Sequence, residues 1–288
     1  MAKGDLGRRV AVAGVGIPLG VAILFVGGWV LTGTLIVLAV IGTLEVYGLA
    51  LERGWRPFRV LGVIVAVLLM VLATHLGSFQ SWAPWALGLL MVLALGGLAG
   101  AVFRRGPGGD PLLAVGTTLL GVAYAALPLA FAVFLRDLPG MGQDGPGWAG
   151  AYLVMFPLVV TWLGDTCAYF TGKHLGKRKL LPSVSPKKTV AGGVGGLVGA
   201  TMGAVAFAAL FLGGSAPATL PLLGAALLGL TIGGVAQVGD LAESVLKREA
   251  GVKDSGNILP GHGGVLDRFD AIYFTLPLTY AALPFLLQ

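Results

Sequence analysis

The sequence predicts an all-α, polytopic integral membrane protein, and three observations point to this class. The 288 residues are 56% hydrophobic and only 11% charged, whereas about a quarter of the residues in a soluble domain are charged. The mean hydropathy is +0.90. Apolar runs of roughly 18 residues or more recur along the chain, and a helix of that length crosses a bilayer. The runs lack the alternating polarity that a membrane β-barrel requires.

Nine apolar segments are predicted to span the membrane, and each boundary is placed to within a few residues. In chain order they cover residues 10–28, 30–50, 59–76, 83–103, 111–135, 149–171, 190–213, 219–239 and 270–287. With the N-terminus in the cytoplasm, every Lys and Arg except Arg136 falls in an inside segment, as the positive-inside rule requires. This partition supports the span count and predicts that the N-terminus lies inside and the C-terminus outside.

The chain is predicted to form a single membrane domain, residues 1–288, with two unlike halves. Residues 1–148 have short loops with few polar motifs, whereas residues 149–288 contain two long, charged loops on the inner side of the membrane. We therefore place the chemistry in the second half. In residues 192–203, glycines at four-residue spacing predict a helix-packing face, and a phosphate-binding loop is the alternative. Cys167 cannot form an intrachain disulfide and is predicted to be a small packing residue.

The segment WLGDTCAYFTGKHLGKRKLLPSVSPKKT, residues 162–189, places one acidic side chain before a strongly basic loop. Asp165 lies near the inner end of the sixth predicted span, where an ionisable residue is a functional candidate. The alternative is a structural ion pair with a Lys of the loop. The loop is predicted to bind anions, with Ser185, Lys187 and Lys188 as candidates. The alternative is that its charge only sets the orientation in the membrane.

The segment QVGDLAESVLKREAGVKDSG, residues 237–256, carries four polar side chains at helical spacing. Asp240, Glu243, Ser244 and Lys247 are spaced i, i+3, i+4 and i+7, so they share one helix face. The alternative is a solvated extension of the eighth span, with an ordinary ion pair between the second and the fourth of these residues.

The segment LPGHGGVLDRFD, residues 259–270, combines a Gly- and Pro-rich loop with two carboxylates. Asp267 and Asp270 are expected on the first turn of the last span, where they repel each other unless a cation lies between them. Mg²⁺ prefers such oxygen ligands; the alternative is the favourable position of an acidic residue at a helix N-terminus. His262 has no second His or Cys nearby for a zinc site, which leaves a phosphate contact or a loop hydrogen bond.

Carboxylates, basic residues and a Gly-rich loop are the components of a phosphoryl- or nucleotidyl-transfer site, where positioning and charge neutralisation provide catalysis. The net charge of +6 suits anionic lipid headgroups and anionic substrates. Nucleic acid is excluded as a partner, because the basic residues are divided among short loops.

The stretch SVLKREAGVKDSGNILPGHGGVLDRFD, residues 244–270, resembles the signature of the phosphatidate cytidylyltransferases, also called CDP-diacylglycerol synthases. It matches every fixed position of Ser-x-x-Lys-Arg, four residues, Lys-Asp-x-Gly, and then Pro-x-His-Gly-Gly-x-x-Asp-Arg-x-Asp. The resemblance covers roughly residues 160–288. One position departs, because Ala191 stands where the family usually has Glu, and the role of that carboxylate is left open.

The resemblance implies the Mg²⁺-dependent reaction of CTP with phosphatidate to CDP-diacylglycerol and pyrophosphate, at the cytoplasmic face of a bacterial inner membrane. The expected metal ligands are Asp240, Asp267 and Asp270, with Asp165 completing the site. A second cation, monovalent or divalent, stays open. The expected residues that neutralise the triphosphate are Lys247, Arg248, Lys253 and Arg268. The expected substrate-binding residues are Ser185, Lys187, Lys188, Ser244 and His262. The oligomeric state, a homodimer included, stays open.

Two other functions remain as alternatives. A CTP-dependent polyprenol or phytol kinase would transfer the γ-phosphate to an alcohol and release CDP. An ion-coupled transporter would use the carboxylates as an ion path, but transporter sites lie near the bilayer midplane, often between repeats. Here the carboxylates lie mainly at the inner ends of spans.

Overall fold

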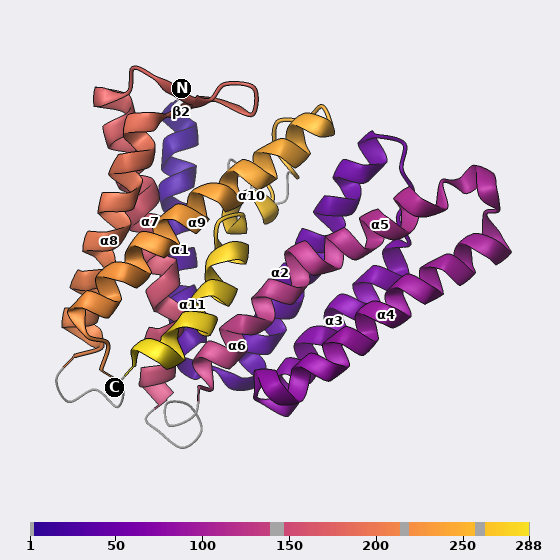
Figure 1. The fold of residues 1–288 in the computed structure, drawn as a ribbon, viewed down its shortest axis with the longest axis horizontal. Helices are drawn as coiled ribbons and strands as arrows, with labels where there is room; N and C mark the ends of the chain where they lie inside the picture. The colour runs from indigo at the N-terminus through magenta and orange to yellow at the C-terminus, as the bar shows by residue number, and fades with distance from the viewer. Residues whose placement is uncertain (1–2, 139–146, 214–218, 257–262, 288) are drawn as a thin grey trace. The chain divides into compact units, whose positions relative to one another are not determined.

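The computed structural model describes residues 3–138, 147–213, 219–256 and 263–287, which are helical apart from one short hairpin (Figure 1). The chain divides into two compact units, which we describe separately. Unit 1 comprises Met1–Phe134 and Leu246–Phe269, and unit 2 comprises Leu135–Val245 and Asp270–Gln288.

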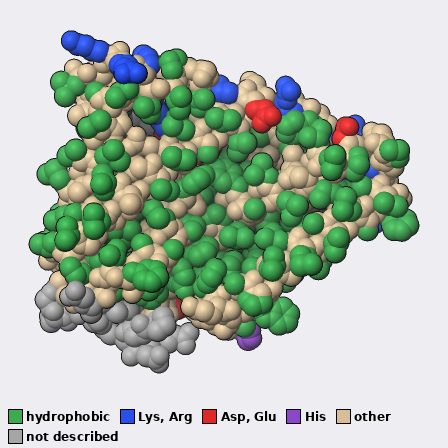
Figure 2. All heavy atoms as spheres, in the orientation of Figure 1, with side chains coloured by type: hydrophobic (Ala, Val, Ile, Leu, Met, Phe, Trp, Pro, Cys, Tyr) green, Lys and Arg blue, Asp and Glu red, His purple; other side chains and the backbone are tan. Residues whose placement is uncertain are grey.

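Eight helical segments in the described residues are long and apolar enough to cross a membrane, and Gly14–Val26 adds a shorter apolar stretch. The eight segments are Gly28–Glu52, Arg59–Leu76, Phe79–Arg104, Pro107–Arg136, Trp148–Leu175, Val190–Phe211, Leu222–Glu249 and Leu266–Leu286. Each of them overlaps a predicted span, so the all-α, polytopic membrane class is confirmed, and the first predicted span, residues 10–28, corresponds to the shorter stretch. Figure 2 shows hydrophobic side chains over much of the visible face, as expected where helices meet lipid. The protein is therefore a multi-pass membrane protein.

Unit 1 contains the helices of the N-terminal half and one short helix from the C-terminal part. Its elements are α1 (Lys3–Val26), α2 (Gly28–Glu52), α3 (Arg59–Leu76), α4 (Phe79–Arg104), η1 (Pro107–Gly109), α5 (Pro111–Gly121), η2 (Val122–Ala126), η3 (Leu127–Leu129) and α10 (Leu266–Phe269). Helix α6 (Ala130–Arg136) begins in unit 1 and ends in unit 2. Helices α3 and α4 lie side by side, and α2 packs against α3 and α5 (Figure 1).

Tyr47 of α2 lies at the centre of unit 1. Its ring is fully buried, and its hydroxyl donates a hydrogen bond to the Thr118 carbonyl of α5 over 2.9 Å. A Cβ added at Gly62 or Gly121 would collide with the Tyr47 side chain. The two glycines therefore let α3 and α5 close around the phenol, and this packing fixes α2, which contributes to the site described below.

Unit 2 contains the long helices of the C-terminal half. Its elements are α7 (Gly147–Leu175), β1 (Lys179–Leu181), β2 (Ser185–Thr189), α8 (Val190–Phe211), α9 (Leu222–Glu249) and α11 (Ile272–Leu286), and the last residues of α9 belong to unit 1. Helices α7 and α8 lie side by side, joined by the antiparallel β1–β2 hairpin (Figure 1). The sequence predicted only a basic loop here. Thr189 caps α8, because its hydroxyl accepts a hydrogen bond from the Gly192 amide over 3.1 Å.

Glycines of α8 form the face that packs on α7. Gly192, Gly196, Gly199 and Gly203 are buried. A Cβ at Gly196 would lie 3.1 Å from the Ala168 Cβ, and one at Gly199 would collide with Cys167. The predicted packing face is thus confirmed, as is the role of Cys167 as a small packing residue.

Candidate active site

Lys247 and Asp267 form a buried ion pair in unit 1. Lys247 lies in the last turn of α9, and its Nζ is 2.6 Å from Asp267 Oδ1 of α10. The two side chains are only 11% and 7% exposed, respectively. A buried charge is costly unless it is paired and hydrogen-bonded. The two signature residues therefore compensate each other's charge, and each fixes the other's position.

The second oxygen of Asp267 organises the loop that precedes it. Oδ2 accepts hydrogen bonds from the Ser255 amide at 2.9 Å, the Ser255 hydroxyl at 2.8 Å and the Gly264 amide at 2.9 Å. Together with Lys247, these donors occupy about the four lone-pair sites that a carboxylate offers. Asp267 thus holds the two ends of the signature loop and the end of α9 in one hydrogen-bonded group.

A second carboxylate of this group, Glu45 of α2, was missed by the sequence analysis. Its Oε1 accepts a hydrogen bond from the Val265 amide at 2.9 Å, and its Oε2 accepts one from the Leu266 amide at 2.7 Å. The Ser255 hydroxyl lies 3.2 Å from the same Oε2. A single Glu within an apolar span was the available signal, since an ionisable residue in a membrane helix is usually functional or paired.

A second pair of charged residues lies in unit 2. Lys188 Nζ of β2 is 2.5 Å from Asp240 Oδ2 of α9, and these side chains are 26% and 38% exposed. Asp165 of α7 is near enough to interact electrostatically with both of them. Unit 2 therefore brings together three predicted site residues from three different elements.

The chain at Asp270 packs on α9 beside Asp240. A Cβ at Gly239 would lie 2.7 Å from the Asp270 carbonyl oxygen and 3.0 Å from the Ala271 Cα. Glycine at position 239 thus permits this close approach. The signature aspartate and Asp240 therefore belong to packed segments of the same unit.

The expectation that Asp267 and Asp270 share the first turn of one helix is wrong. Asp267 lies in the four-residue helix α10, and Asp270 lies in the turn between α10 and α11. Asp270 Oδ1 accepts a hydrogen bond from the Ala271 amide over 2.7 Å, at the start of α11. Two turn residues, Asp270 and Ala271, thus separate α10 from α11.

The other predicted site residues differ in burial. Lys187 is exposed and Ser185 is partly buried on β2, whereas Ser244 is buried on α9. Of the predicted site residues in unit 1, Arg248, Lys253 and Arg268 are exposed. Arg248 donates a hydrogen bond to the Val252 carbonyl over 3.0 Å and so closes the end of α9. His262 lies outside the described residues.

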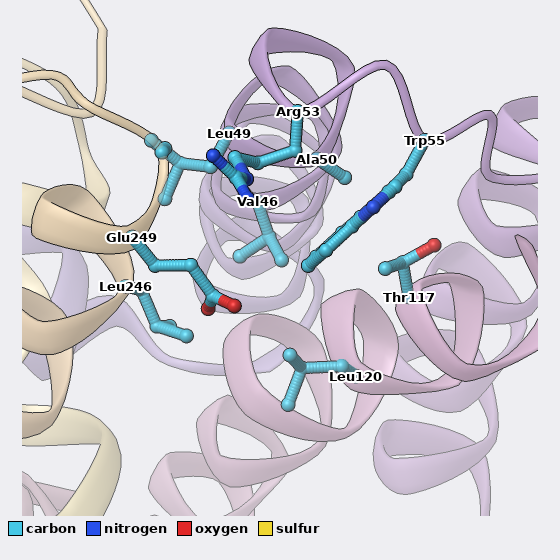
Figure 3. Close-up of a pocket in the computed structure, with 10 residues that line it drawn as sticks. Val46, Leu49, Ala50, Arg53, Trp55, Thr117, Leu120, Leu246 and Glu249 are labelled. Atoms are coloured by element: carbon cyan, nitrogen blue, oxygen red, sulfur yellow. The ribbon is translucent and has the colours of Figure 1, made fainter. Parts of the chain in front are cut away.

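Unit 1 also holds a small cavity between α2, α5 and the end of α9 (Figure 3). Its volume is about 40 Å³, and its lining includes Arg53, Trp55, Thr117 and Glu249. Figure 3 shows the Trp55 ring and the Glu249 carboxylate reaching toward the same opening. A space of this size holds a few water molecules at most, so it does not accommodate a nucleotide or a lipid headgroup in this conformation.

Comparison with known proteins identifies the family. The model of the family described as "Cytidylyltransferase family" matches residues 7–286. This chain belongs to the cytidylyltransferase family. It is 32% identical over 293 residues to the phosphatidate cytidylyltransferase of Synechocystis sp., covering 95% of this chain and 94% of the relative. The phosphatidate cytidylyltransferase of Bacillus subtilis is 42% identical over 166 residues, or 58% of this chain and 57% of the relative. The resemblance read from residues 244–270 is confirmed.

Proposed function

We infer that this protein is a phosphatidate cytidylyltransferase, which transfers CMP from CTP to phosphatidate and releases pyrophosphate. The observation that carries this function is the family match over residues 7–286, together with a relative of that activity over 95% of the chain. The geometry is consistent with it, because Lys247, which is buried, and Lys188, which is partly exposed, each lie beside a carboxylate in residues 160–288.

The reaction makes one bond and breaks one. A phosphate oxygen of phosphatidate attacks the α-phosphorus of CTP, and the bond from this phosphorus to the bridging oxygen of the leaving pyrophosphate breaks. The second pKa of a phosphate monoester is near 6, so the attacking group is largely a dianion at neutral pH. No strong general base is required, and the protein must chiefly position two anions and neutralise their charge.

The residues of unit 1 supply fixed positive charge. Lys247 is buried and held by Asp267, so its ammonium group is already oriented before a phosphate arrives. Arg248, Lys253 and Arg268 are exposed, and we assign their positive charges to neutralisation of the triphosphate. In unit 2, Lys187 and Lys188 of the hairpin bind the lipid or nucleotide phosphate, with Ser185 and Ser244 as hydrogen-bond donors. His262 is proposed as a further phosphate contact.

The acidic residues suit a divalent metal ion such as Mg²⁺. In unit 2, Asp165 is near enough to Asp240 to interact with it electrostatically, and the backbone at Asp270 packs on α9 at Gly239, so these three residues are the candidates for hard oxygen ligands. Among the described residues, three His, Cys, Asp or Glu side chains are nowhere close enough to bind one ion by themselves. Substrate phosphates would then complete the shell, as is usual for Mg²⁺. The inclusion of Asp267 with Asp240 and Asp270 rests on the resemblance to the family signature alone, because the Asp267 oxygens already accept hydrogen bonds from Lys247, Ser255 and Gly264. The bound ion would neutralise phosphate charge.

The enzyme is proposed to work at the cytoplasmic face of a bacterial inner membrane. This orientation rests on the distribution of the basic residues, which places the N-terminus inside and the C-terminus outside. A reporter fused after Gln288 should therefore be active only in the periplasm. A cytoplasmic reporter signal would mean that the number of spans is wrong by one.

Two labels of CTP test the reaction type. With purified protein, Mg²⁺ and phosphatidate, label in the α-phosphate should appear in the lipid, and label in the γ-phosphate should appear in pyrophosphate. A lipid kinase would place the γ label in the lipid and the α label in CDP. A transporter would convert neither label.

A further inference from the structure

Glu45 is a buried carboxylate to which the proposed reaction assigns no role. It lies in α2, in the N-terminal half, and only 6% of its surface is exposed. Its neighbours along the helix are apolar or small, so its charge must be compensated by groups from elsewhere in the fold. In the described part of the chain, three donors from the signature segment, more than 200 residues later, contact this carboxylate.

We propose that Glu45 is a positioning residue that fixes the signature loop and thereby the Lys247–Asp267 ion pair. Its two oxygens bind the amides of Val265 and Leu266, at the start of α10. The first amides of a helix have no partners within it, and hydrogen bonds from amides to a carboxylate are stronger than neutral ones. Glu45 thus fixes the turn from which Asp267 projects.

Ser255 connects the two carboxylates directly. Its hydroxyl is 2.8 Å from Asp267 Oδ2 and 3.2 Å from Glu45 Oε2. A hydroxyl has one proton to donate, so the carboxylates of Glu45 and Asp267 compete for it. The Ser255 amide also donates to Asp267 Oδ2, and this second hydrogen bond keeps Ser255 close to Asp267. A displacement of the Glu45 carboxylate would therefore change the hydrogen bonding of Asp267.

Two glycines of the signature leave the space that Glu45 occupies. A Cβ at Gly256 would lie 2.6 Å from Glu45 Oε1, and one at Gly264 would collide with both carboxylate oxygens. The side chain on α2 thus gives a physical reason for glycine at two positions of a motif that begins about 200 residues later. A carboxylate surrounded so closely by donors and backbone is held in one position.

The test compares Glu45→Gln with Glu52→Gln, a matched change at the exposed end of the same helix. In Glu45→Gln, the amide NH₂ replaces one acceptor oxygen and faces a backbone N–H. We expect the kcat for transfer of the α label from CTP to phosphatidate to fall at least about 30-fold, with the KM for CTP changed less than about threefold. Hydrogen exchange should increase in the peptides that contain Ser255 and Val265–Leu266. The Glu52→Gln variant should match the parent in each measurement.

A double-mutant cycle separates positioning from an independent effect. If Glu45 acts through the loop, the combined loss in Glu45→Gln/Ser255→Ala should be smaller than the product of the single losses. Multiplicative losses, or unchanged exchange in Glu45→Gln, would overturn the proposal. If Glu45→Gln does not fold in detergent, Gly256→Ala is the alternative variant, because its added methyl group crowds the same carboxylate without removing the charge. Gly256→Ala should then show the slower turnover and the faster hydrogen exchange. Normal turnover and normal exchange in this variant would overturn the proposal.

The inference about catalysis rests on the proposed function, but its failure can be recognised separately. If the parent protein transfers no α label, the proposed function is wrong, whereas hydrogen exchange still reports whether Glu45 fixes the loop. If the parent is active and Glu45→Gln is equally active, the positioning role is wrong and the function stands.

Discussion

The ion pairs of the two units have the same chemistry but different surroundings. Lys247 and Asp267 are almost completely buried, and the carboxylate oxygens of Asp267 accept bonds from Lys247 and from two residues of the signature loop. Lys188 and Asp240 are about one-quarter and more than one-third exposed, and a further carboxylate, Asp165, lies near them. The first pair is satisfied within the protein, whereas the second keeps access for an incoming ion. The comparison shows that burial and hydrogen bonding fix the first pair, whereas solvent exposure leaves the second pair open to exchange of partners.

The largest effect is expected when the buried pair is broken. Asp267→Asn leaves the Lys247 ammonium buried without its counter-charge, which costs about 3–5 kcal/mol of unfolding free energy. We also expect turnover to fall about 100-fold or more, because the oriented cation is lost. Label transfer and denaturation in detergent measure these two effects.

A control variant distinguishes the lost pair from a general packing defect. In Lys247→Met/Asp267→Leu both charges are removed, so most of the lost stability should return while activity stays absent. If Asp267→Asn has the same unfolding free energy as the parent, the buried Lys247 ammonium does not need Asp267 as its counter-charge, and the prediction is wrong.

A smaller effect on stability, but a clear one on metal dependence, is expected at the exposed pair. Asp240→Asn should change the unfolding free energy by less than about 1 kcal/mol, because exposed ion pairs contribute little. Turnover should fall roughly tenfold, and more Mg²⁺ should be needed for half-maximal activity, because a proposed ligand is lost. Titration of Mg²⁺ in the label assay checks this. An unchanged Mg²⁺ requirement would remove Asp240 from the proposed metal ligands.

The smallest effect is expected at Arg248, which is exposed and bonded only to a backbone carbonyl in the contacts described above. Arg248→Gln should lower kcat/KM for CTP by less than about fivefold. The difference should shrink at high salt, because ions screen exposed charges. A loss above tenfold that persists in high salt would instead place this guanidinium in direct, water-excluded contact with the triphosphate.

The sequence predicted the features that are local in the chain. The spans follow from the length and polarity of apolar runs, and the α7–α8 contact follows from glycines at four-residue spacing. The signature predicted Lys247 and Asp267 as site residues. It did not predict that they form an ion pair, because this contact depends on the conformation of the loop between α9 and α10. It also did not predict the turn at Asp270 that follows the helix of Asp267.

Features that depend on distant partners were not predictable. The position of Glu45 in an apolar span marks it as unusual, but the sequence does not identify its partners, and the chemistry was predicted for residues 149–288. Only the fold shows that the amides of Val265 and Leu266 reach it from 220 and 221 residues away. The β1–β2 hairpin was likewise read as a loop, since Pro182 and Pro186 interrupt any strand pattern in the segment.

The long separation between Glu45 and its donors has a consequence for biosynthesis. Glu45 of α2 is synthesised 220 residues before Val265. At about 5–20 residues per second, this interval lasts roughly 10–40 s. During that time the carboxylate has none of its native donors from the signature segment. A chain that ends before Ser255 never gains these donors, and its Glu45 carboxylate stays without them in an apolar helix. The hydrogen bonds of this carboxylate in the first half of the chain therefore form only after the signature segment in the second half has been synthesised.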